Sequence, residues 1–127
     1  MIIEIDMASE TPIYTQLVYQ IKLGIVRGRM HAGDSLPSVR SLAGDIGINL
    51  HTVNKAYKVL VGEGVLTQVK KGYEISRETP PKISETYKEE FKEKLFDLMI
   101  DANVFDIDVD MLLEEMKIKL KGDEQHD

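Results

Sequence analysis

The segment from Asn49 to Gly62 carries side chains that could contact the bases and phosphates of a nucleic acid. On a helix of about 100° per residue with Val53 buried, its outward side holds polar and cationic groups and no Asp or Glu. An ordinary solvated face, the alternative interpretation, usually mixes both charges. An acid-free face suits the major groove of DNA, which recognition helices enter. The groups on or beside this side are His51, Thr52, Asn54, Lys55 and Lys58.

Arg40 stands where a cation is unfavourable unless an anion approaches it. It falls in the first turn of an expected helix that begins after Ser38, and the macrodipole is positive there. The free backbone N–H groups of such a helix start bind anions. We therefore interpret Arg40, with Ser38 beside it, as a contact to phosphate or to a guanine edge. A salt bridge from Arg40 to Asp34 or Asp45 is the alternative.

Lys70 and Lys71 precede Gly72 in a sequence typical of a tight turn between two strands. At the projecting tip of a hairpin, two lysines could clamp a phosphate or enter the minor groove. The same sequence is equally typical of a plain soluble turn. The place of this turn in the order of elements therefore decides between the two interpretations.

The chain lacks the residue sets that enzymes and metal sites need. It has no Cys, which excludes disulfides, Cys-ligated zinc, iron–sulfur clusters and thiol catalysis. Asp106, Asp108 and Asp110 resemble the start of a calcium loop. Met111 and Lys117 replace the Gly and Glu that such a loop requires, so we expect these acids to serve a helix start. We predict no catalytic residue, no metal site and no cofactor.

Helix signals surround the candidate contact residues. A four-residue apolar repeat follows Pro12, with Thr11 as the expected N-cap and Gly28 as the expected end. Ser38 and Asn49 each cap a further helix, and only a short turn separates the two. This spacing predicts a helix-turn-helix.

A β-hairpin is expected directly after the third helix. Residues 65–69 and 73–76 have the composition of strands, and residues 70–72 form the turn between them. A helix-turn-helix followed by a hairpin is a winged helix, so the basic turn becomes the tip of the wing.

The charge balance divides the chain into two parts. Residues 1–77 hold 9 basic and 7 acidic residues, whereas residues 78–127 hold 7 and 15. The sign changes beside Pro80-Pro81, a pair that continues neither a helix nor a central strand. We expect a winged helix-turn-helix DNA-binding domain over residues 1–77 and a short helical dimerisation tail over residues 78–127. The predicted fold is mostly α with a small β-hairpin.

The tail has the pattern of two helices joined by a connection at residues 103–106, with Asp108 capping the second helix. Its apolar residues fall on more than one helix face, and one two-helix hairpin does not bury them all. We therefore expect a partner surface, most simply a second copy of the chain. The residues assigned to this dimer interface are Phe91, Leu95, Phe96, Met99, Ile100, Leu112, Leu113 and Met116.

The composition also indicates a compartment. No apolar run approaches the roughly 20 residues that cross a bilayer. Residues 1–6 carry acid where a secretory signal carries base. Together with the absence of Cys, these features predict a cytoplasmic protein that does not contact a membrane.

The order of these motifs resembles the GntR family of bacterial transcription regulators. The resemblance spans roughly residues 10–76. The matching blocks are Pro12-Ile13-Tyr14-Thr15-Gln16-Leu17, Gly33-Asp34-Ser35-Leu36-Pro37-Ser38-Val39-Arg40-Ser41-Leu42-Ala43, Gly47-Ile48-Asn49, Thr52-Val53, Ala56-Tyr57, Leu60 and Gly64. The wing departs from the family's pattern, because it is one residue shorter and lacks the first of the family's two wing glycines.

The resemblance implies a winged-helix regulator that binds double-stranded DNA. Only about 45 residues follow the Pro pair, and so short a tail is similar to that of the YtrA subfamily, which mainly dimerises the protein. The resemblance thus implies a homodimer on a palindromic operator, most simply a repressor; a winged helix that binds protein instead of specific DNA is the alternative. The resemblance implies no particular small-molecule effector. The DNA contacts that it implies are Ser38, Arg40, Asn49, His51, Thr52, Lys55 and the wing-tip Gly72.

Overall fold

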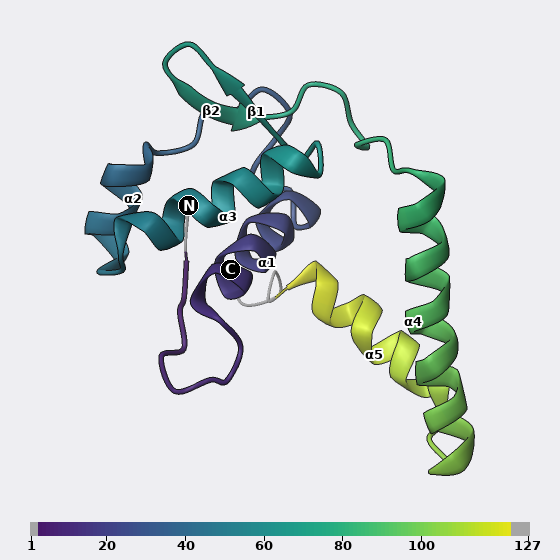
Figure 1. Ribbon diagram of the computed structural model, residues 1–127. Coiled ribbons are helices and arrows are strands. Elements are labelled where there is room, and N and C mark those ends of the chain that lie inside the picture. Colours follow the sequence, from purple (N-terminus) through teal and green to yellow (C-terminus); the bar gives the residue numbers. More distant parts are fainter. Residues whose placement is uncertain (1–2, 123–127) are drawn as a thin grey trace. The chain divides into compact units, whose positions relative to one another are not determined.

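The computed structural model describes residues 3–122, which contain five helices and one two-stranded sheet (Figure 1). The chain forms two compact units that divide between Lys82 and Ile83. None of the helices in the described part has the length and hydropathy of a membrane span. The elements in chain order are α1 (Ile13–Val26), α2 (Val39–Ile46), α3 (Leu50–Gly62), β1 (Leu66–Val69), β2 (Gly72–Ile75), α4 (Glu85–Val104) and α5 (Val109–Lys121).

The first unit is a winged helix whose core lies between α1, α2, α3 and the hairpin. Its largest fully buried side chains come from α1 and α3, in the stripes that the sequence predicted. Burying such side chains is the main stabilisation of a domain this small. The fully buried residues are Leu17, Ile21, Val53, Tyr57 and Leu60.

The start of α1 differs from the prediction. Thr11 is not the N-cap; Pro12 is, in an extended conformation and without a side-chain capping bond. The Gln16 amide replaces the cap. Its Nε2 donates to the carbonyls of Thr11 at 2.9 Å and Asp6 at 3.0 Å, and its Oε1 accepts from the Asp6 N–H at 2.8 Å. The N-terminal segment is therefore fastened to the first turn of α1.

The helix-turn-helix signals are confirmed. Ser38 Oγ accepts the Ser41 N–H at 3.0 Å, and Asn49 Oδ1 accepts the His51 N–H at 2.7 Å. Gly47 ends α2 in the left-handed conformation, with φ of 69°. That conformation costs an L side chain energy and costs glycine little, which is why the turn between the helices contains a glycine.

The wing is an antiparallel hairpin in which Leu66 pairs with Ile75 and Val69 pairs with Gly72. Lys70 and Lys71 form the turn, as predicted, and β2 begins at Gly72 because that residue already pairs with β1. A third segment extends the hairpin before α2. The Leu36 N–H donates to the Tyr73 carbonyl at 2.9 Å, so the wing is hydrogen-bonded to the chain that leads into α2.

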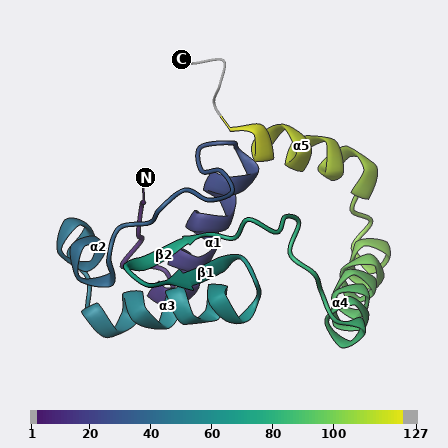
Figure 2. The ribbon, with the colours of Figure 1, turned by 90° about the horizontal axis from the view of Figure 1, so that it is seen from above.

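The second unit consists of α4 and α5, joined by residues 105–108 and not by residues 103–106. Asp106 takes a left-handed φ of 53°, and Asp108 Oδ1 accepts the Met111 N–H at 3.1 Å, so the predicted cap of α5 is confirmed. The two helices diverge from their connection (Figures 1 and 2). Among the described residues of this unit only Ala102 is buried.

Candidate nucleic-acid interface

The outward side of α3 is open. His51, Lys55 and Lys58 are exposed, and Thr52 is half-buried beside them. Within residues 3–122 none of the cations on this helix forms an ion pair. The opposite side is anchored by fully buried core residues, so the helix presents the face that the sequence predicted. Asn49 is exposed as well, with its side-chain oxygen used in the cap.

Lys55 has a partner that the sequence analysis did not assign. Its Nζ lies 4.0 Å from the centroid of the Tyr14 ring, in the first turn of α1. A cation at this distance over an aromatic face is attracted by the ring quadrupole. Tyr14 belongs to one of the blocks that carry the resemblance, but no spacing rule connects a residue in α1 to one in α3, so only coordinates could reveal the pair.

Arg40 is exposed in the first turn of α2, beside the capping Ser38. The alternative interpretation of Arg40 is wrong for the described part of the chain, because no ion pair joins it to Asp34 or Asp45. Asp34 bonds elsewhere, since its Oδ2 accepts the His31 N–H at 2.7 Å. The guanidinium of Arg40 is thus left free to contact an anion at the positive end of the helix.

Tyr57 connects the recognition helix to both neighbouring parts of the interface. Its buried hydroxyl donates to the Pro37 carbonyl at 2.8 Å, immediately before the cap of α2. Its ring meets the Tyr73 ring of β2 edge to face, with centroids 4.9 Å apart. Burial, with a smaller contribution from Tyr73, raises the pKa of Tyr57 far above its usual value, so the hydroxyl stays protonated and remains a donor. Tyr57 lies four residues after Val53, so helix spacing places it on the buried side of α3, but no local pattern reveals its two contacts.

The wing is hydrogen-bonded to the segment that leads into α2, and its tip is exposed. Lys70 and Lys71 are exposed, and Gly72 has φ of 143°. The antiparallel bond from Leu36 to Tyr73 joins the segment before α2 to the strand that follows this tip. Both views place the hairpin loop on the side of the unit where α2 and the beginning of α3 lie (Figures 1 and 2). The hairpin loop, α2 and the beginning of α3, which carry most of the predicted contact residues, therefore lie on one side of this unit.

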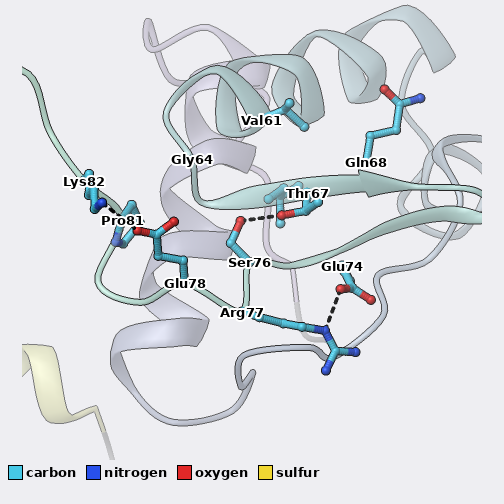
Figure 3. A pocket seen from close by; sticks show the side chains of 11 residues that line it. Val61, Gly64, Thr67, Gln68, Glu74, Ser76, Arg77, Glu78, Pro81 and Lys82 are labelled. Atoms are coloured by element: carbon cyan, nitrogen blue, oxygen red, sulfur yellow. Dashed lines mark hydrogen bonds and ion pairs between the residues drawn. The ribbon is translucent and has the colours of Figure 1, made fainter.

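An open cavity of about 680 Å³ lies beside the hairpin and residues 76–82 (Figure 3). Its charged groups pair with one another: Arg77 Nε lies 3.0 Å from Glu74 Oε1, and Lys82 Nζ lies 3.4 Å from Glu78 Oε1. None of the predicted contact residues lines this cavity. Elsewhere in residues 3–122, no group of three potential ligand residues could hold a metal ion.

Comparisons with known proteins show the family to which the chain belongs. Residues 13–73 match the family described as bacterial regulatory proteins, gntR family. The HTH-type transcriptional repressor YtrA of Bacillus subtilis is 38% identical to this chain, over 98% of this chain and 99% of its own length. The chain belongs to the GntR family. The resemblance seen in the motifs is therefore confirmed, and a member of this family of transcription regulators is not an enzyme.

Solved structures extend the likeness to the tail of this GntR protein. A transcriptional antiterminator from Listeria monocytogenes EGD-e is 31% identical, with a TM-score of 0.88 over 96% of this chain and 94% of its own. YtrA from Sulfolobus acidocaldarius, a GntR-family transcription factor, is 38% identical, with a TM-score of 0.65 over 79% of this chain and 99% of its own. The chain is thus a DNA-binding transcription regulator of the GntR family, with a winged helix-turn-helix and a short helical tail of the YtrA type.

Proposed function

We propose that the chain is a transcriptional repressor that binds a palindromic operator as a homodimer. The observation that carries this proposal is the acid-free, exposed side of α3, held in place by a fully buried opposite side. A surface with only cations and hydrogen-bonding groups favours a polyanion, and the width of α3 suits the major groove.

The proposed contacts divide by chemistry. The first residues of α3 reach base edges, because the beginning of a recognition helix enters the groove most deeply. The start of α2 and the wing tip contact phosphates, because backbone N–H groups, an Arg and lysines supply positive charge there. The residues are Asn49, His51 and Thr52 for bases, and Ser38, Arg40, Lys55, Lys58, Lys70, Lys71 and Gly72 for the backbone.

The tail supports the homodimer. The side chains assigned to the interface are between 38 and 66% exposed within one chain, and they include two Phe. Exposed apolar surface on this scale is unfavourable in water. A second copy that covers it would stabilise the dimer by about 25 cal/mol for each Å² of apolar surface buried. A two-fold symmetric dimer would set two α3 helices about 34 Å apart, or a multiple of that, on successive major grooves.

Repression follows from occupancy. A dimer bound over a promoter blocks access to it, and the relative in Bacillus subtilis is named a repressor. The proposal places the protein in the cytoplasm, where a bacterial chromosome lies.

The experiment is a selection of fragments from random duplex DNA with the full chain, followed by sequencing of the bound fraction. We expect a palindrome whose half-sites are about one helical turn apart. The affinity for the selected duplex should fall steeply as salt rises, since phosphate contacts release counterions. Recovery of sequences without a common motif, or affinity that salt does not change, would contradict the proposal and favour a protein-binding winged helix.

A further inference from the structure

We propose that Tyr14 is a positioning residue for DNA binding, whose ring holds Lys55 so that this lysine contacts the DNA backbone and not a base. The inference rests on the proposed function, because Lys55 meets DNA only if α3 faces it. It adds a residue of α1 to an interface otherwise built from α2, α3 and the wing.

The geometry of the pair carries the proposal. Lys55 Nζ lies 4.0 Å from the Tyr14 ring centroid, well inside the range of a cation–π interaction. Tyr14 is half-buried and packs against the core, so the position of its ring is fixed by the fold. Lys55 is exposed, and its long side chain would otherwise be free to adopt many rotamers.

Lys55 has an aromatic ring and not a carboxylate as its neighbour, so its position is restricted while its charge is kept. From Leu50 to Gly62, α3 contains no acid, and no ion pair involves Lys55 within the described residues. A carboxylate would neutralise the lysine and compete with phosphate. An aromatic ring leaves the positive charge intact and reduces the entropy lost when the lysine meets DNA.

The direction in which Lys55 is held favours a backbone contact. Its ammonium lies over a ring of the neighbouring helix α1, and Lys55 itself follows the first residues of α3, which reach bases. A lysine is also a point charge without the bidentate geometry that reads a guanine edge most strongly. Lys55 is therefore assigned to the phosphates at the edge of the groove.

The test measures the affinity of the full chain for its selected operator and for a scrambled duplex, by fluorescence anisotropy. Tyr14→Leu removes the ring, Tyr14→Phe keeps it, and Tyr19→Leu is the matched control. Tyr19 lies in the same helix, is exposed, and has its own lysine, Lys22, at 5.1 Å. Lys22 pairs with Glu63, the C-cap of α3, and is not a proposed DNA contact. Tyr14→Leu should weaken binding to both duplexes by about three- to fivefold, whereas Tyr14→Phe and Tyr19→Leu should bind within about twofold of the original chain.

A double-mutant cycle identifies the coupling. Lys55→Met should weaken binding to both duplexes. It should also make the slope of log affinity against log salt shallower, by about one released counterion. Its cost should shrink when Tyr14→Leu is already present, because the lysine is then no longer held. If the costs of the two substitutions in binding free energy simply add, the proposal is overturned. It is also overturned if Tyr14→Phe lowers the affinity as much as Tyr14→Leu, because the hydroxyl and not the ring would then matter. A loss confined to the operator would show a base contact and also overturn it.

A measurement without DNA separates this proposal from the proposed function. In the free protein the Lys55 ε-methylene protons should show an upfield ring-current shift in NMR spectra, and Tyr14→Leu should abolish it. Absence of that shift in the original chain overturns the positioning role, even if operator binding is normal. Its presence in a chain that binds no duplex would contradict the proposed function and leave the Tyr14–Lys55 contact established. Circular dichroism of each variant verifies the fold.

Discussion

Single residues of the interface differ in how much the fold depends on them. Arg40 is exposed and free of ion pairs in the described chain, whereas Tyr57 is fully buried and bonded. A substitution at Arg40 should therefore report on DNA binding alone, and one at Tyr57 on stability as well.

Arg40→Ala should weaken operator binding by about 1–3 kcal/mol, because it removes a charged contact at the start of α2. The melting temperature should stay unchanged, since no intramolecular partner is lost. Gel-shift titration and a thermal melt measure the two quantities. Arg29→Ala is the control, because it removes the same charge from an exposed residue beyond the end of α1. Unchanged operator affinity for Arg40→Ala would refute the assigned contact.

Tyr57→Phe should lower the free energy of unfolding by about 1 kcal/mol, because the Pro37 carbonyl loses its donor. It should also weaken operator binding, since the same bond fixes the segment that leads into α2. Urea unfolding and anisotropy measure these effects. Tyr73→Phe is the matched control, because it removes a hydroxyl from the neighbouring ring while keeping the ring contact. Equal stability of Tyr57→Phe and the original chain would show that the bond contributes nothing.

At the scale of elements, most of the winged helix could be predicted from the sequence. The caps Ser38 and Asn49 and the Gly47 turn are local signals, and the structure confirms each of them. The start of α1 was predicted wrongly. The Gln16 side chain donates to backbone carbonyls five and ten residues earlier in the chain, and no capping rule describes bonds over such separations. Tyr14 with Lys55 and Tyr57 with Pro37 are tertiary pairs, so spacing within one element gave no sign of them.

The basic tip of the hairpin can be tested separately. Replacing Lys70 and Lys71 together by Ala should weaken binding to the operator and to random duplexes by similar factors, because phosphate contacts carry no sequence information. The slope of log affinity against log salt should become shallower by about two counterions. A loss on the operator alone would instead place the wing in a groove, reading bases.

At the scale of the whole molecule, each unit has its own proposed task. We propose that the winged helix contacts the operator and that the tail sets the distance between the two winged helices of a dimer. The tail buries only Ala102 among its described residues, which supports the proposal that a second copy of the chain stabilises it.

Placing a charge at the proposed dimer interface tests this division. Phe91→Glu combined with Leu112→Glu should convert the full chain to a monomer, because two carboxylates would be buried without partners. Sedimentation velocity measures the change, and operator affinity should fall because the two half-sites are then bound independently. Thr86→Glu adds a charge to an exposed polar position of α4 and should leave the dimer intact. A double variant that still sediments as a dimer would contradict the assigned interface.

The most direct test of the central claim is an NMR titration of the isotope-labelled full chain with its selected operator duplex. The largest chemical-shift changes should fall on the outward side of α3, the first turn of α2 and residues 70–72, while α4 and α5 change little. Changes concentrated on the tail, or on the cavity beside residues 76–82, with α3 unaffected, would contradict the claim that this helix enters the DNA groove.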